Sequence, residues 1–221
     1  MRARDIAAAI VMAGSFSLAV GVGGLMFHHK AKAADHLDPP ARTTGEGADI
    51  ASDIADIFVW NDASTVKIIL TAAGPATSGT APVYDKDVLY QIHISNTGDP
   101  TTAQFTIMAR YGKDANGNWG VQFTGIPGSS GPVSGPVQTQ LADSNVPAIK
   151  AEAGLFTDPF FFDLEGFNDT KSTGILSIRS DRDFFAGKND TDLIIEFPRS
   201  AIQNGTHPIN VWGETGRITG T

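Results

Sequence analysis

The sequence contains no cysteine among its 221 residues. A disulfide framework, a thiolate metal site and a cysteine nucleophile are therefore excluded. The hydrophobic core alone has to hold the fold together, and a chain of this length buries enough surface to do so.

Positive charge is also scarce, with 16 lysines and arginines against 24 aspartates and glutamates and a net charge of -8. Nucleic-acid binding needs a basic face that neutralises phosphates, so we exclude it. The motifs G-x-S-x-G, H-E-x-x-H and the P-loop are absent too. The sequence therefore favours a non-enzymatic protein and leaves an enzyme open.

The N-terminal segment carries an uncharged run at residues 6–27. Its length suits a retained transmembrane helix, which needs ~20 apolar residues. A cleaved signal peptide is the alternative, because Ala31, Lys32 and Ala33 match an A-x-A cleavage site. We therefore expect a segment 1–34 that anchors the chain in the membrane or is removed. An extracytoplasmic domain, 35–221, follows on the periplasmic or extracellular side of a bacterial inner membrane, or is secreted.

Short runs rich in β-branched residues recur along this domain, separated by Gly, Pro and Asn turns. The pattern predicts an all-β fold, an antiparallel sandwich or barrel-like domain of about ten strands, preceded by one N-terminal hydrophobic helix. The Asn116-Gly117 pair predicts a hairpin, and Pro198 a single helical turn at 198–202. The clearest expected strands are 53–60, 65–71, 88–95, 103–111, 119–123, 137–140, 174–179, 191–197 and 208–213.

Phenylalanine is concentrated in two short runs, DPFFFD at 158–163 and DFFAGKND at 183–190. Aromatic side chains bury the most apolar area per residue, so we expect both runs to nucleate the core. In a strand, Phe160 and Phe162 would face one way and Phe161 the other. A strand that is apolar on both faces belongs inside a packed structure, which leaves the binding surface elsewhere.

A metal site is one interpretation of the acids around these phenylalanines. His36 and Asp38 share a face of an extended chain and can reach one ion together. Asp158, Asp163 and Asp183 can supply oxygen ligands to a calcium or transition-metal ion. The alternative is that the three aspartates are turn residues that hydrogen-bond their own backbone. His93, a lone histidine on the more polar face of a strand, is expected to be structural.

Seven stretches together resemble the domain of unknown function 4331 family of bacterial exported proteins. They are residues 35–39, 53–58, 87–93 with 96–99, 158–163, 183–189, 193–199 and 211–213. The resemblance covers nearly all of 35–221 and implies a location and a fold but no reaction. The chain departs from the family in its shorter loops and in the few acids of its 96–99 turn.

Two function hypotheses follow from these observations. The first is a non-enzymatic extracytoplasmic domain that binds a protein partner, or serves as an accessory subunit of a membrane assembly, and contacts the membrane through residues 6–27 if these are uncleaved. The second is a metal-binding or hydrolytic domain in which His36, Asp38, Asp158, Asp163 and Asp183 converge on one ion.

Overall fold

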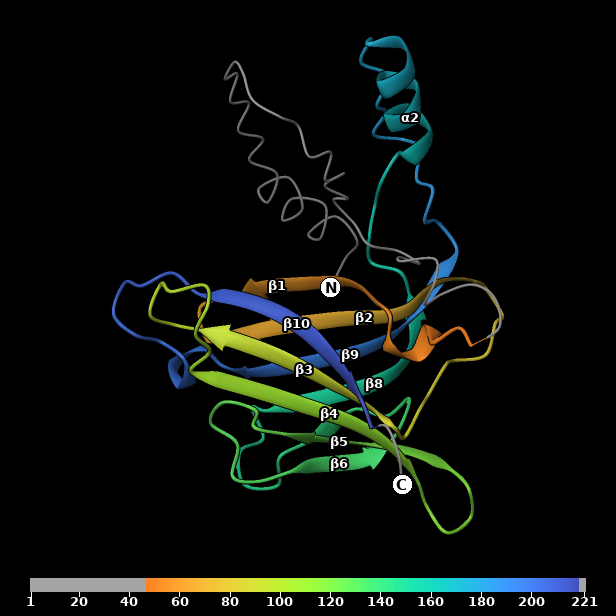
Figure 1. Cartoon of the computed structure of the whole chain (residues 1–221). Helices are drawn as coiled ribbons and strands as arrows, with labels where there is room; N and C mark the ends of the chain where they lie inside the picture. Colours follow the sequence, from red (N-terminus) through yellow and green to blue (C-terminus); the bar gives the residue numbers. More distant parts are fainter. Residues whose placement is uncertain (1–46, 219–221) are drawn as a thin grey trace. The chain divides into compact units, whose positions relative to one another are not determined.

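The structure is a computed structural model that describes residues 47–218 (Figure 1). These residues form two antiparallel five-stranded sheets that pack face to face, which confirms the predicted sandwich of about ten strands. The first sheet has the order β1 (Ile54–Asn61), β2 (Thr65–Thr77), β9 (Lys188–Pro198), β8 (Lys150–Thr157), β7 (Leu141–Ala142). The second has the order β10 (Asn210–Arg217), β3 (Val88–Ser95), β4 (Phe105–Lys113), β5 (Trp119–Thr124), β6 (Val133–Pro136).

Alternation of buried and more exposed residues along much of β3, β4 and the start of β2 places these strands between core and solvent. On β3, Val88, Tyr90, Ile92 and Ile94 are buried, as the period-two pattern predicts. The hairpin at Asn116-Gly117 is confirmed, and Gly117 adopts the positive φ of 86° that the turn requires. The predicted helical turn after Pro198 is the 3-10 turn η3 (Arg199–Ala201).

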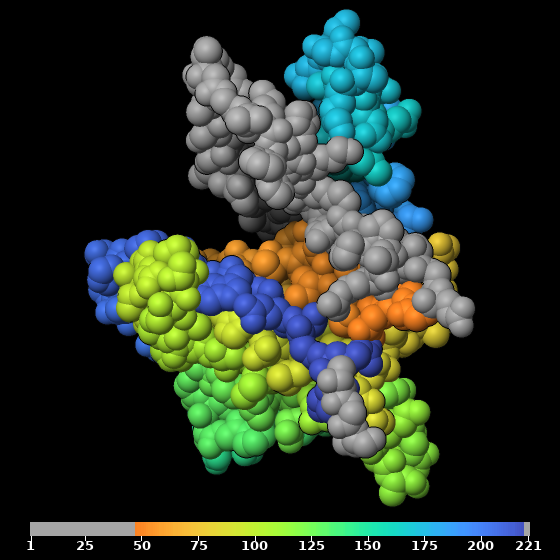
Figure 2. All heavy atoms as spheres, viewed as in Figure 1, coloured from red at the N-terminus to blue at the C-terminus, as the bar shows by residue number. Residues whose placement is uncertain are grey.

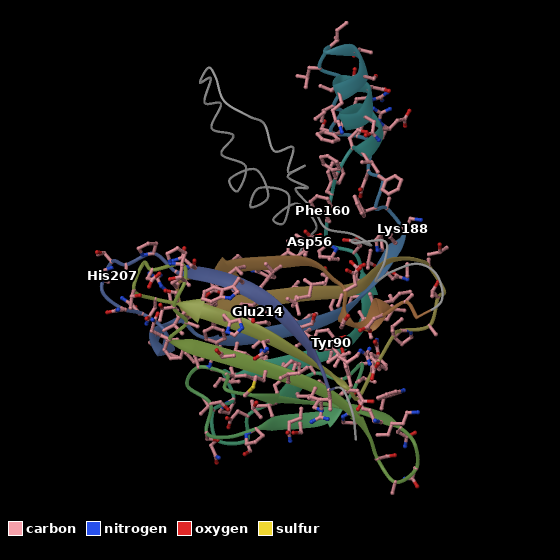
Figure 3. The ribbon with its side chains drawn as sticks, in the orientation of Figure 1. Asp56, Tyr90, Phe160, Lys188, His207 and Glu214 are labelled. Carbon is pink, nitrogen blue, oxygen red and sulfur yellow. The ribbon has the colours of Figure 1, made fainter. Side chains whose placement is uncertain are left out.

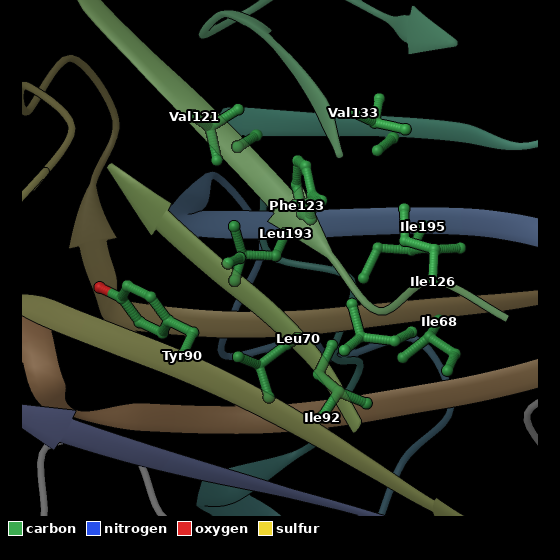
Figure 4. Packing of buried hydrophobic residues seen from close by; sticks show 14 of the residues in the cluster. Ile68, Leu70, Tyr90, Ile92, Val121, Phe123, Ile126, Val133, Leu193 and Ile195 are labelled. Carbon is green, nitrogen blue, oxygen red and sulfur yellow. The ribbon is translucent and has the colours of Figure 1, made fainter. Parts of the chain in front are cut away.

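The core lies between the two sheets and is mostly aliphatic (Figure 4). Both sheets contribute large side chains that are almost completely buried, and the hydrophobic effect of this burial is the main stabilising term. Its largest members are Tyr90, Phe123, Phe197, Ile68, Leu70, Ile92, Ile94, Ile107, Ile149, Leu193, Ile195 and Ile202.

The prediction that the clustered phenylalanines form this core is wrong. Residues 160–162 and 174–179 are not strands, and the helix α2 (Leu164–Thr173) lies between them. The sandwich core among the described residues contains no phenylalanine from residues 156–185. These residues instead leave the end of β8, form a separate excursion and return at β9. The expected strand 137–140 is also displaced, since it falls between β6 and β7.

The predicted N-terminal helix, with its run at residues 6–27, lies outside the described residues. Within 47–218 no helix is long and apolar enough to cross a membrane.

Candidate functional site: an apolar arm on the sandwich

Residues 158–187, which we call the arm, project from the end of the first sheet (Figures 1 and 2). The arm begins where Thr157 of β8 pairs with Asn189 of β9. The amide of Asp158 then donates to the Lys188 carbonyl at 3.0 Å, which closes the base of the arm. Figure 3 shows Phe160 and Lys188 at this base, where the ribbon leaves the sandwich.

The two acid-phenylalanine runs form the two segments of the arm, 158–163 and 183–187, that connect the sandwich to the rest of the arm. We call these two segments the stalk. Asp158 Oδ1 accepts a hydrogen bond from the Phe160 amide at 2.8 Å, and Asp183 Oδ1 accepts one from the Phe185 amide at 2.9 Å. The amide of Phe184 donates to the Phe162 carbonyl at 3.0 Å, so the two runs lie side by side. Each aspartate thus closes a local turn, a role that aspartate side chains commonly fill.

The phenylalanine rings pack on one another within the arm. The ring centroids of Phe160 and Phe185 are 5.0 Å apart in an edge-on arrangement, and those of Phe162 and Phe167 are 5.4 Å apart. Phe185 is only 5% exposed. Such contacts stabilise beyond the area they bury. The arm therefore has a small aromatic core of its own, separate from the core of the sandwich.

Asp163 organises the rest of the arm. It is the N-cap of α2, and its Oδ1 accepts a hydrogen bond from the Gly166 amide at 2.9 Å. Arg182 donates to both of its carboxylate oxygens, at 2.6 and 2.9 Å, and the Arg179 amide donates to Oδ2 at 2.9 Å. The Arg182 hydrogen bonds are the main reason that the pKa of Asp163 falls to about 2. This carboxylate ties the start of the helix to the returning chain.

Gly166 fits close to this carboxylate because it has no side chain. A Cβ atom there would lie 2.3 Å from Asp163 Oδ2 and 2.5 Å from the Ser177 carbonyl oxygen. At the far end of the helix, Gly174 takes the left-handed conformation, and its amide donates to the Thr170 carbonyl.

The outer surface of the arm is unusually apolar. Ile175 and Leu176, just after the helix, are 70% and 78% exposed, the highest values among the large hydrophobic residues described. We call residues 174–178 the tip. The exposed large hydrophobic residues of the arm are Phe161, Phe167, Ile175, Leu176, Ile178 and Phe184. Large apolar side chains exposed in such number on one short excursion are typical of an interaction site.

Carboxylates are buried near the base of the arm. Asp190 and Asp192 lie on the face of β9 that points away from the sandwich core, yet they are 0% and 2% exposed, and Asp158 is 7% exposed. Burial raises the pKa of Asp192 to about 8, and the neighbouring Asp158 charge adds to this effect. Asp192 is therefore protonated at neutral pH.

The residues predicted to bind metal are placed as follows. His36 and Asp38 lie outside the described residues. Asp158, Asp163 and Asp183 are all in the arm, but each accepts hydrogen bonds from backbone amides, and Asp163 is also paired with Arg182. Residues 47–218 contain no group of three or more His, Asp or Glu side chains that could hold an ion. A site completed by His36 and Asp38 stays a prediction.

The sequence reasoning placed His93 correctly on an outer strand face. His93 Nδ1 lies 3.0 Å from Thr106 Oγ1, and the ring stacks on Trp212. The arm, in contrast, was not predicted from the sequence to be an exposed structure. Asp163 before the helix α2 and Gly174 after it are nevertheless recognisable signals for the start and end of a helix.

Comparisons with family models, with curated proteins and with solved structures each found no match to this chain.

Proposed function

We propose that this chain is a non-enzymatic binding or accessory subunit held at the extracytoplasmic side of a bacterial membrane, and that the arm docks an apolar surface of a protein embedded in that membrane. The observation that carries the proposal is the exposed tip. Solvated Ile175 and Leu176 side chains contribute nothing to the sandwich core, so their exposure is explained best by a partner that buries them.

The internal order of the arm supports binding rather than a loose loop. The Asp163–Arg182 pair, the mutually packed phenylalanine rings and the α2 caps hold the exposed side chains in place before any partner arrives. A preordered surface loses less conformational entropy on binding, which raises affinity.

The position of the arm supports a partner in the membrane. Ile54, the first residue of β1, pairs with Ala72, which pairs with Thr191, and Thr191 is only three residues from the arm base at Lys188. The chain therefore enters the sandwich at the end from which the arm leaves. The uncharged run ends at Phe27, twenty residues before Gly47 (47 minus 27). If the run is an anchor, an extended connection of this length spans at most ~70 Å, which leaves the arm within reach of proteins in the same membrane.

The test is co-purification from native membranes solubilised in a mild detergent. The variant Ile175→Ser/Leu176→Ser removes the apolar tip. The matched control is Val59→Ser/Trp60→Ser on β1, where the two side chains are 43% and 42% exposed but distant from the tip in sequence and outside the arm. We expect a membrane protein that co-purifies with the wild-type chain and the control to be lost with the tip variant.

Two results would contradict the proposal. A partner retained equally by the tip variant would place the binding surface elsewhere. The second result is that the wild-type and tip-variant chains differ in binding to protein-free vesicles but co-purify with the same proteins. The tip would then bind the lipid bilayer and not a protein partner.

A further inference from the structure

A pocket outside the arm opens on the outer face of the second sheet. Its volume is about 590 Å³, and it is lined by residues of β10, by the residue before it and by the loop between β3 and β4. This size lies within the ~300–1,000 Å³ of small-molecule sites. The lining residues are Pro100, Thr101, Ile209, Asn210, Val211, Trp212 and Glu214.

The polar side of the pocket follows from strand geometry. Asn210, Trp212 and Glu214 alternate along β10, so they point to the same face of the sheet. The intervening Gly213 faces the core instead, because a Cβ there would lie 2.6 Å from Leu70 Cδ1. An amide, an indole and a carboxylate therefore stand in a row on the outer surface, and Figure 3 shows Glu214 on this sheet.

The Trp212 indole is held in a fixed position. It pairs across the strands with His93, and the two rings stack with centroids 5.2 Å apart and planes at 26°. His93 is itself held by Thr106, at 3.0 Å from its Nδ1. Glu214 Oε2 lies 3.4 Å from His93 Nε2, and 58% of the Glu214 side chain is exposed. The ring is thus rigid, while the carboxylate still has oxygens open to a ligand.

The amide of Asn210 supplies a second, independent indication. Its Nδ2 atom is buried, and within residues 47–218 it has no hydrogen-bond partner. A buried donor without an acceptor is costly and is uncommon in folded proteins. Asn210 lines the pocket, so a small rotation of its side chain toward a bound ligand would give Nδ2 an acceptor.

We propose that this pocket binds a short segment of a carbohydrate chain. The apolar C–H face of one sugar ring packs on the Trp212 indole, hydroxyls of a neighbouring ring donate to the Glu214 carboxylate, and a sugar oxygen on the other side accepts from Asn210 Nδ2. Asn210 and Glu214 are four residues apart on an extended strand, about 13 Å, so consecutive rings of one chain reach both groups. An anion would be repelled by Glu214 and by the net charge of -8. A purely apolar ligand would leave both the carboxylate and the amide without partners.

The test is titration of the full chain, purified in detergent, with cellotetraose, with chitotetraose and with glucosamine, followed by tryptophan fluorescence and calorimetry. The two oligosaccharides separate a plain hydroxyl-bearing glycan from an N-acetylated one, and glucosamine tests whether positive charge alone suffices. The variants are Trp212→Ala, Asn210→Ala and Glu214→Gln. The control is Trp60→Phe, an exposed tryptophan on β1 that does not line the pocket.

We expect saturable binding of at least one oligosaccharide, weakened at least tenfold by each pocket variant and unchanged in Trp60→Phe. Circular dichroism and thermal melting show that each variant is folded. The proposal is overturned if no oligosaccharide binds up to about 10 mM, or if folded pocket variants bind as the wild type does. Binding of glucosamine alone, abolished by Glu214→Gln, would also overturn it and identify a cationic ligand.

Discussion

The substitution Asp192→Asn should stabilise the protein at neutral pH and change how its stability depends on pH. Asp192 lies on β9 between Thr71 of β2 and Gly154 of β8, and it is 2% exposed. Its Oδ1 atom has no hydrogen-bond partner among residues 47–218. Asparagine has nearly the same shape but cannot ionise, so the change isolates the free energy of keeping this buried carboxyl protonated.

The sign and size of the change in unfolding free energy follow from the pKa of Asp192. This pKa is about 8 in the folded chain, against an ordinary value of 3.8. Below pH 3.8 the carboxyl is protonated in both states and costs nothing. Between pH 3.8 and 8 the unfolded chain releases the proton while the folded chain keeps it, so stability falls as pH rises. At pH 7 the loss is on the order of 4 kcal/mol, from 1.36 kcal/mol for each pH unit above 3.8.

The assay is urea unfolding at a series of pH values between 4 and 9. We expect Asp192→Asn and the wild type to be close at pH 4, and the variant to become increasingly more stable up to pH 8. Glu196→Gln is the matched control, because Glu196 lies on the same face of β9 but is partly exposed and faces Lys67 at 3.5 Å. Identical pH profiles for Asp192→Asn and the wild type would refute a buried, protonated Asp192.

Further predictions concern the arm, the core and the arm base. Asp163→Asn should loosen the arm and leave the sandwich intact, so limited proteolysis within 158–187 should accelerate at least about tenfold. An unchanged cleavage rate would contradict the role of Asp163 in tying the start of α2 to the returning chain. Phe123→Ala, in the sandwich core, should lower the free energy of unfolding by about 3–5 kcal/mol. Phe161→Ala, 45% exposed on the arm, should change it by less than about 1 kcal/mol; equal losses in chemical denaturation would show that the arm shares the core. Gly74→Ala should destabilise, because a Cβ there would lie 1.4 Å from Asp190 Oδ1; an unaltered melting temperature would contradict this close approach.

The strands were predictable because a half-buried strand has apolar side chains at alternate positions. Val88, Tyr90, Ile92 and Ile94 are buried, the residues between them are only partly buried, and this alternation fixes both the element and its inward face. The pairing of the strands was not predictable. β10 pairs with β3 across more than a hundred residues, so nothing local in the sequence brings Trp212 next to His93.

The arm was misassigned because composition does not distinguish a buried strand from a self-packed excursion. Residues 160–162 are apolar on both faces, which fits burial in a sandwich, but Phe160 packs against Phe185 and Phe162 against Phe167 within the same arm, and Phe161 is exposed. The repeat of an aspartate before each phenylalanine pair was the informative signal, since each aspartate closes a turn at one chain of the stalk.

The docking role of the arm is tested most directly by the reactivity of a single thiol at its tip in native membranes. The chain has no cysteine, so Leu176→Cys gives one labelling site, and Thr206→Cys, in the exposed loop before β10, gives a control. We predict that a water-soluble maleimide labels position 176 at least about tenfold more slowly than position 206, as expected for a tip that is mostly bound, and that detergent which separates the partner removes the difference. Equal labelling of both positions in native membranes would contradict the account.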